Sequence, residues 1–162
     1  MTLAATDERH LRTAIELARR SREKGNHPFG SLLTDADGTV VLEAENTVVS
    51  AHDVTGHAEL NLVRAASARF DTDALGSHTL YTSTEPCAMC AGAIYWSGIG
   101  RVVFALSSAT FQGKIDPDGT AGLALSCREV FERGGRAVEV SGPHREDLAW
   151  EVHAGFWQPE GT

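Results

Sequence analysis

The chain contains 162 residues, of which 42% are hydrophobic and 22% are charged, values typical of one soluble globular domain. Its formal net charge of −8 disfavours binding to a nucleic-acid backbone, because phosphate contacts need clustered lysine and arginine. The N-terminus carries acids and no apolar run, and no stretch approaches the roughly 20 apolar residues that span a bilayer. We therefore expect a single cytoplasmic domain over residues 1–162, with no membrane partner.

The first predicted element is a helix over residues 7–24. Its buried face follows the i, i+3, i+4, i+7 spacing of an amphipathic helix: Leu11, Ala14, Ile15 and Ala18. Gly25 ends this helix. Residues 30–33 and 39–44 then predict two strands, and the turn over residues 35–38 favours an antiparallel hairpin.

The middle of the chain alternates between helical and strand patterns. The expected elements are a helix over 57–69, a strand over 79–83, a helix over 87–97, a strand over 101–105, a helix over 123–133 and a strand over 137–140. The helix over 87–97 contains no charged residue, so we expect it to be buried on most sides. A helical crossover normally returns the chain to a parallel strand. The pattern therefore predicts an α/β fold with five strands, mostly parallel after the hairpin, and helices on both faces.

Two segments have no regular pattern. Residues 107–120 contain glycine, proline and two aspartates, so we expect a mobile or functional loop. The tail over residues 144–162 is aromatic, with Trp150, Phe156 and Trp157 close together. Such a tail either docks onto its own domain or completes the pocket of a partner subunit, and the pattern leaves both readings open.

Three cysteines are too few for a secreted disulfide framework. Cys127 falls in a predicted helix, where a buried apolar role is expected. Cys87 and Cys90 instead form a Cys-x-x-Cys pair after Pro86, at a predicted helix start that favours the thiolate form. This spacing indicates either a metal site or a redox pair.

A His-x-Glu motif stands at another predicted helix start, where His57 can supply a third ligand. Two thiolates, one imidazole and one open position are the donor set of a catalytic zinc site, in which a water ionises near neutral pH. Glu59 cannot share the helical face of His57, so we expect it beside the metal, where it acts as a general base and acid. A structural zinc site would need a fourth ligand at a matching short spacing, and none is present. The two motifs together predict catalytic zinc rather than a redox or binding module.

Through these motifs the chain resembles the cytidine deaminase superfamily, in particular its guanine deaminases and tRNA adenosine deaminases, over about residues 7–141. The resemblance implies a three-layer α/β/α sandwich with a five-stranded mixed sheet, one zinc ion per subunit and a homodimer. It also implies the reaction, in which an exocyclic amine on a base is replaced by oxygen and ammonia is released. One departure precedes His57: the family commonly has Asp-Pro-Thr-Ala where this chain has Asp53-Val54-Thr55-Gly56, so we expect a looser turn.

The same resemblance points to residues that bind substrate. Asn46 matches an asparagine that holds the base, and Phe29, in Pro28-Phe29-Gly30, matches a phenylalanine of the pocket. Trp96 matches the Tyr-Trp pair of guanine deaminases, whose C-terminal segment also covers the partner's active site; Phe156 and Trp157 fit that role. Guanine deaminases use a second carboxylate as well, for which Asp118 is the candidate and Asp116 its rival.

The net charge, the match at Trp96 and the aromatic tail favour guanine as the substrate, which is converted to xanthine. A tRNA adenosine deaminase is the alternative, although the net charge disfavours it and its basic candidates are only Arg101 and the run Arg19–Lys24. That run also fits the C-terminal turn of a solvated helix. Cytosine or an aminotriazine is a further alternative, since a zinc site alone does not distinguish ring systems.

Overall fold

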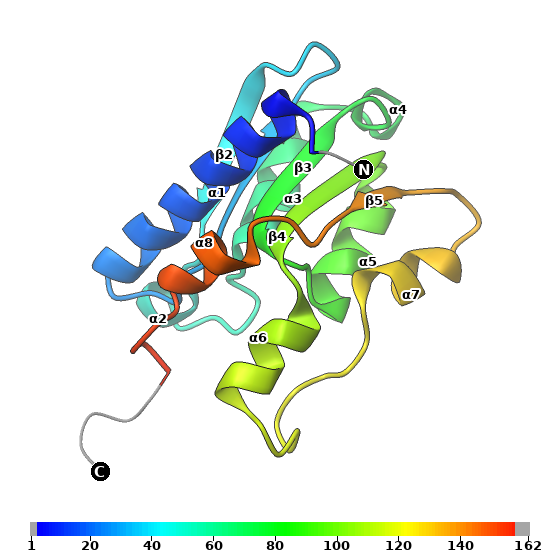
Figure 1. The fold of residues 1–162 in the computed structure, drawn as a ribbon. Coiled ribbons are helices and arrows are strands. Elements are labelled where there is room, and N and C mark those ends of the chain that lie inside the picture. Colours follow the sequence, from blue (N-terminus) through cyan, green and yellow to red (C-terminus); the bar gives the residue numbers. More distant parts are fainter. Residues whose placement is uncertain (1–2, 158–162) are drawn as a thin grey trace.

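A computed structural model describes residues 3–157 of the chain (Figure 1). Its strands are β1 (Gly30–Thr34), β2 (Val40–Glu45), β3 (Thr79–Thr84), β4 (Arg101–Leu106) and β5 (Glu139–Ser141). Its helices are α1 (Ala5–Glu23), α2 (Val48–Ala51), α3 (Ala58–Arg69), α4 (Thr72–Leu75), α5 (Ala88–Ser97), α6 (Ser108–Ile115), α7 (Cys127–Glu132) and α8 (Glu146–Glu151).

The strands form one mixed sheet in the order β2-β1-β3-β4-β5. Strand β1 pairs antiparallel with both β2 and β3, whereas β3, β4 and β5 run parallel. The hairpin between β1 and β2 closes as expected, because the Asp35 carboxylate accepts the backbone N–H groups of Asp37 and Thr39. This mixed sheet confirms the predicted cytidine deaminase-like fold class.

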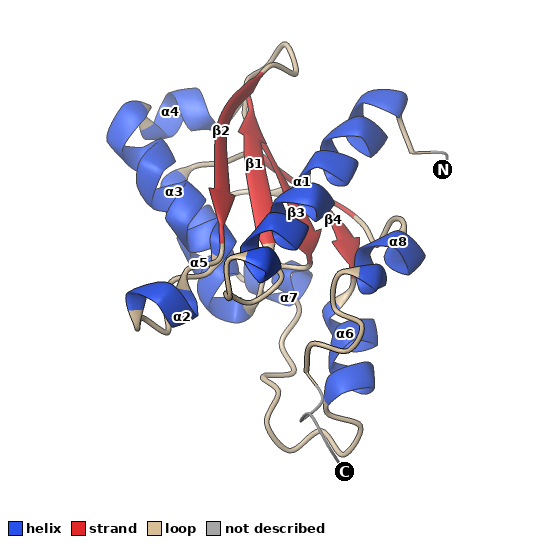
Figure 2. Cartoon of the chain, turned by 90° about the vertical axis from the view of Figure 1, so that its left-hand side faces the viewer, coloured by secondary structure: helices blue, strands red, loops and turns tan. Residues whose placement is uncertain are grey.

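Helices cover both faces of the sheet. Figure 2 shows α3 and α5 on one side and α1 and α8 on the other. One apolar core lies under α3, α5 and α7, and a second lies under α1 and α8. Leu32 and Leu33 are adjacent in β1 and both fully buried, each in a different core, so this central strand is apolar on both faces. The arrangement is the predicted three-layer sandwich.

Several elements differ from the sequence-based expectation. The segment predicted as a loop over 107–120 begins with α6, whose N-cap Ser107 accepts the Thr110 N–H and whose Phe111 is buried. The helix predicted over 123–133 begins only at Cys127, after a capping box formed by Ser126 and Glu129. Short helices α2, α4 and α8 were not expected, because four to six residues carry little periodicity.

Helix α5 is less buried than its composition predicted. Cys90, Ala91 and Ile94 are fully buried, but Met89 is 39% exposed and Trp96 is 81% exposed. One side of this uncharged helix therefore faces away from the sheet. Within the described residues, no helix is both long and apolar enough to cross a membrane.

Candidate active site

His57 and Cys87, which were expected at helix starts, occupy the N-cap positions of α3 and α5. These two helices pack against each other on one face of the sheet. Their contact brings together three ligand atoms from two distant segments: Nδ1 of His57 and the sulfurs of Cys87 and Cys90. All three lie within 4.8 Å of one another.

The separations fit a tetrahedral zinc ion. With Zn–S bonds of about 2.3 Å and a Zn–N bond of about 2.0–2.1 Å, tetrahedral angles require N···S separations of roughly 3.5 Å. Nδ1 of His57 lies 3.6 Å from the Cys87 sulfur and 3.4 Å from the Cys90 sulfur. No fourth cysteine, histidine or carboxylate joins this group among the described residues, which leaves one coordination position for water or substrate. The donor set is that of a catalytic zinc site.

The electrostatics of the two sulfurs differ, although the helix start was expected to favour the thiolate form of both. A hydrogen bond from the Cys90 thiol, together with one from His57, holds the pKa of Cys87 at about 4. The same contact with Cys87, and burial, raise the pKa of Cys90. Cys87 is therefore the more readily ionised sulfur, and its thiolate form is the one that binds a metal.

Glu59 lies beside the ligand atoms without joining them. It is 5% exposed, and burial raises the pKa of its carboxyl group. Oε2 lies 3.8 Å from the Cys90 sulfur, while Oε1 accepts a hydrogen bond of 2.8 Å from the Thr82 hydroxyl. The carboxylate is thus oriented by β3 and adjacent to the metal position.

A cavity of about 140 Å³ opens at this position. Its lining combines the metal-site residues with two aromatic rings and several polar groups: Phe29, His57, Glu59, Thr84, Glu85, Cys87, Ser108, Phe111 and Gln112. The rings of Phe29 and Phe111 lie 5.6 Å apart. A pocket with apolar walls and a few convergent polar groups is suited to a small planar heterocycle.

The turn before His57 is not loose, contrary to the expectation from Gly56. The Asp53 carboxylate accepts both the backbone N–H and the hydroxyl of Thr55, and the Gly56 carbonyl accepts the Thr47 N–H. A Cβ at Gly56 would lie only 2.8 Å from the Thr47 hydroxyl oxygen. Glycine therefore allows a close approach of two segments, and this contact fixes the ligand helix.

Glu85 connects the metal centre to the two helices that follow it. Its carboxylate accepts the backbone N–H of Ser108 at 2.9 Å and that of Cys127 at 3.1 Å. These are the first residues of α6 and α7, whose N-terminal ends favour a negative charge. Apart from Glu59, Glu85 is the carboxylate that lines the pocket within the described chain.

One predicted substrate residue, Phe29, lies at the pocket, and Asn46 donates its backbone N–H to the Phe29 carbonyl at 3.1 Å. Asn46 is 1% exposed, and its Oδ1 accepts the Val48 N–H at 3.0 Å. Its Nδ2 has no acceptor among residues 3–157, so this amide keeps a donor for another molecule.

The other predicted substrate residues lie outside the pocket of this chain. Trp96 is exposed on α5. Trp157 packs behind the pocket against Phe29 and Phe111, and Phe156 packs against Trp157. The described part of the tail therefore docks onto its own domain, and residues 158–162 lie outside the described chain.

Neither predicted second carboxylate reaches the pocket. Asp118 is exposed, and Asp116 uses its carboxylate to accept the N–H groups of Ala121 and Gly122 in its own loop. Gln112 and Phe111 were not predicted from the sequence, because they lie in a segment whose pattern indicated a loop. Thr84 and Glu85 adjoin the Pro-Cys motif and could have been found from that proximity.

Comparisons with known proteins agree with this site. Residues 4–106 match the family model described as the cytidine and deoxycytidylate deaminase zinc-binding region. A probable cytosine deaminase from Schizosaccharomyces pombe is 41% identical over 157 residues, which cover 96% of this chain and 94% of that protein. A tRNA-specific adenosine deaminase from Bacillus subtilis is 31% identical over 151 residues, covering 93% and 88%.

A solved structure of guanine deaminase from Nitrosomonas europaea is similar as well. It has 26% sequence identity and a TM-score of 0.74, covering 94% of this chain and 84% of that one. The family match extends over more than half of the chain and contains all three zinc-ligand positions. The chain belongs to the cytidine and deoxycytidylate deaminase family, and it is a zinc-dependent deaminase, a hydrolase that acts on C–N bonds.

Proposed function

We propose that the protein deaminates a free pyrimidine base, with cytosine as substrate and uracil and ammonia as products. The observation that carries this proposal is the similarity to the probable cytosine deaminase, which extends over 96% of the chain and includes the C-terminal segment. From the sequence, guanine was the first expectation and cytosine was among the alternatives. The similarity favours that alternative, since the guanine deaminase structure is more distant.

The size of the pocket supports a free base. A cavity of about 140 Å³ is small for a cofactor or drug-sized ligand, whose pockets usually exceed about 300 Å³. Phe29 and Phe111 supply apolar walls for a planar ring. Gln112 supplies a neutral side-chain amide, which suits an uncharged heterocycle with donor and acceptor edges.

Glu59 carries the proton transfers in the proposed reaction. His57, Cys87 and Cys90 would hold a zinc ion, which would supply the Lewis acidity that makes water nucleophilic at neutral pH. Glu59 accepts a proton from the attacking water, passes it to a ring nitrogen, and delivers a proton to the departing amine. Burial suits this carboxylate to both roles, because a raised pKa brings a carboxyl group closer to the working pH.

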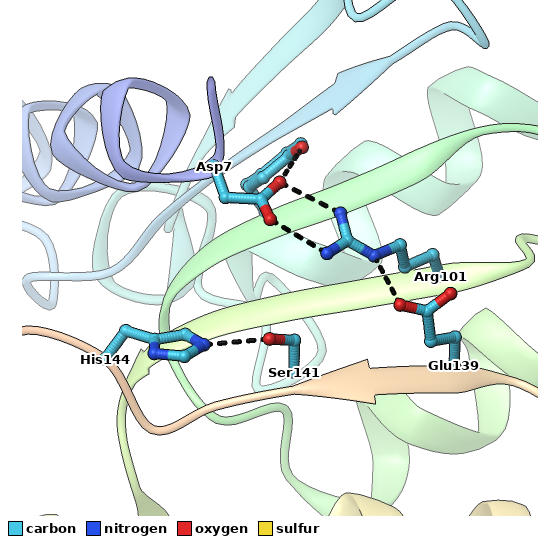
Figure 3. A network of polar contacts seen from close by, with 6 residues as sticks. Asp7, Arg101, Glu139, Ser141 and His144 are labelled. Carbon is cyan, nitrogen blue, oxygen red and sulfur yellow. Dashed lines mark hydrogen bonds and ion pairs between the residues drawn. The ribbon is translucent and has the colours of Figure 1, made fainter. Parts of the chain in front are cut away.

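The basic residues do not favour tRNA as substrate. Arg101 donates two hydrogen bonds to Asp7 and one to Glu139, each of 2.9 Å (Figure 3). In the basic run Arg19–Lys24, each arginine and the lysine already has a protein partner. Arg19 pairs with Glu16, Arg20 and Lys24 with Glu45, and Arg22 with the carbonyls of Val152 and Ala154. Phosphate binding is driven by counterion release, which needs lysine and arginine side chains that are free to contact the nucleic-acid backbone.

The exposed side of α5 supports assembly into a homodimer. Trp96 and Met89 give this helix an apolar outer surface without a covering element in the described chain. Exposed tryptophan is typical of interfaces. Light scattering on the purified protein measures the mass directly, and Trp96→Glu should shift a dimer towards monomer.

Ammonia release from cytosine, guanine, adenine, their nucleosides and aminotriazines tests the substrate proposal. We expect cytosine to have the highest kcat/KM and a Glu59→Gln protein to give only background release. Faster turnover of guanine, or of adenosine in tRNA, would overturn the proposal while leaving the zinc site intact.

A further inference from the structure

The segment after α8 packs against the wall of the substrate pocket. The ring of His153 lies 5.1 Å from that of Phe29 and 4.9 Å from that of Phe111, and both phenylalanines line the pocket. Trp157 packs against the same two rings. His153 itself is 1% exposed. The tail therefore forms a layer directly behind the pocket.

A chain of two hydrogen bonds runs from this layer to the pocket. Nε1 of Trp157 lies 3.2 Å from Nδ1 of His153, and Nε2 of His153 lies 3.4 Å from the hydroxyl oxygen of Thr84. An indole N–H only donates, so Nδ1 of His153 accepts. A neutral imidazole that accepts at Nδ1 carries its proton on Nε2. The histidine must then donate to Thr84.

The environment of His153 keeps the ring neutral. Burial among aromatic side chains lowers the pKa of His153 to about 4, and the Arg22 charge acts in the same direction. Near pH 7 the ring therefore holds one proton. A second proton on Nδ1 would face the Trp157 N–H, and two donors cannot form a hydrogen bond with each other.

Because His153 donates to the Thr84 oxygen, the proton of the Thr84 hydroxyl is left without a partner. Its oxygen accepts from His153, and no acceptor for its own O–H is present among residues 3–157. Thr84 is 4% exposed and lines the pocket with His57, Glu59 and Cys87. A buried donor without a partner is costly, so its location at the pocket indicates that a bound molecule satisfies it.

We propose that Thr84 donates a hydrogen bond to the substrate ring, at a carbonyl oxygen or an unprotonated ring nitrogen, and that His153 and Trp157 are positioning residues that set its direction. The proposal rests on the proposed function, because it assumes that the pocket binds the base. Cytosine carries both kinds of acceptor. The aromatic tail thereby acts on substrate binding through a hydrogen-bond chain, without touching the substrate.

The ¹⁵N NMR spectrum of histidine-labelled protein tests the direction of the chain without any substrate. The His153 signals are assigned by their loss in His153→Gln. We expect the Nε2–H tautomer in the parent protein and a shift towards Nδ1–H in Trp157→Phe, which keeps an aromatic side chain but removes the N–H donor. Trp150→Phe is the matched control: this tryptophan also stacks on His153, and its N–H makes no hydrogen bond among the described residues. An Nδ1–H tautomer in the parent protein would overturn the proposal.

Steady-state kinetics test the contact with substrate. Thr84→Val should lower kcat/KM about tenfold, mainly by raising KM, because it removes one neutral hydrogen bond. Thr84→Ser retains the hydroxyl and should restore kcat/KM. Trp157→Phe should lower kcat/KM a few-fold in the parent. In Thr84→Val it should have no effect beyond that of the packing control Trp150→Phe, because the Trp157 N–H acts through Thr84. A Thr84→Val protein with unchanged kcat/KM, or additive losses in the double variant, would refute the relay.

The two proposals fail in different ways. If the parent protein deaminates guanine rather than cytosine, the substrate proposal fails, and the same variants then test the relay on guanine. If cytosine turns over normally in Thr84→Val, only the relay fails. Melting temperatures of all variants, within about 3 °C of the parent, show that the kinetic differences are not caused by unfolding.

Discussion

The Thr82 hydroxyl lies 2.8 Å from Oε1 of Glu59 and donates a hydrogen bond to it. Thr82 is fully buried in β3, and Glu59 lies in the first turn of α3. The contact therefore joins the sheet to the helix that begins after a zinc ligand. It leaves Oε2 of Glu59 directed towards the sulfur of Cys90, so the sheet sets the orientation of the carboxylate at the metal centre.

Replacing Glu59 separates proton transfer from metal binding. Glu59→Gln retains the shape of the side chain and should retain zinc, but it removes the general base. We expect kcat to fall by at least about two orders of magnitude, the usual contribution of a general acid–base group. Zinc content by atomic emission and ammonia release are measured on the same sample. Near-normal activity in zinc-loaded Glu59→Gln would refute the assigned role.

The Thr82 hydrogen bond should matter less than the carboxylate itself. Thr82→Val removes the donor at nearly constant volume, and we expect kcat to fall about 10- to 100-fold, since bonds to charged groups contribute roughly 1.5–3 kcal/mol. Thr82→Ser retains a hydroxyl and should keep most of the activity. If valine and serine at position 82 give equal rates, the hydroxyl does not orient Glu59.

The two kinds of cysteine should differ in metal binding. Cys87→Ala should lose the zinc ion, all activity and part of the thermal stability, because metal binding contributes to folding. Cys127 is fully buried in the apolar core under α7, so Cys127→Ala should keep one zinc per chain at a modest cost in stability. A zinc titration with a colorimetric chelator distinguishes them. Equal zinc loss in both variants would contradict the ligand set.

Asp7 should stabilise the fold in a pH-dependent way. Arg101 donates two hydrogen bonds to its carboxylate and Tyr81 donates a third, and mainly the Arg101 bonds hold its pKa below the usual 3.8 (Figure 3). Because the folded-state pKa is lowered, this stabilisation is present above about pH 4 and is lost as the pH falls through the folded-state pKa. Asp7→Asn should cost about 1–2 kcal/mol in unfolding free energy at pH 7.

Glu139 provides the control for this prediction. It also pairs with Arg101, but its side chain is 68% exposed, so Glu139→Gln should cost less than about 0.5 kcal/mol. Denaturant unfolding of the parent and both variants is compared between pH 7 and pH 3. The difference in unfolding free energy between the parent and Asp7→Asn should shrink below pH 4. The parent serves as the reference, because zinc release at low pH affects all three proteins. A difference that stays constant over this range would disprove the link to Asp7.

Short-range patterns were sufficient to predict most of the fold and the metal centre. The hairpin, the long helix α1 and the parallel strands followed from hydrophobic periodicity and turn residues. His57 and Cys87 were expected at helix starts and occupy N-cap positions. Predictions were weakest after β4, where α6 was read as a loop and α7 was placed four residues too early, because helices of six to eight residues leave little periodic signal.

By itself the sequence determined the donor set of the zinc site, because two sulfurs and an imidazole at fixed short spacings are local features that the metal requires. Only the tertiary structure decided which other side chains meet there. Gln112 from α6, Thr84 from the end of β3 and His153 from the tail come together through packing between segments far apart in the chain. No local pattern records such contacts, because they depend on how whole elements cross the sheet. Asp118 lies outside the pocket for the same reason: its loop leads away once α6 has formed.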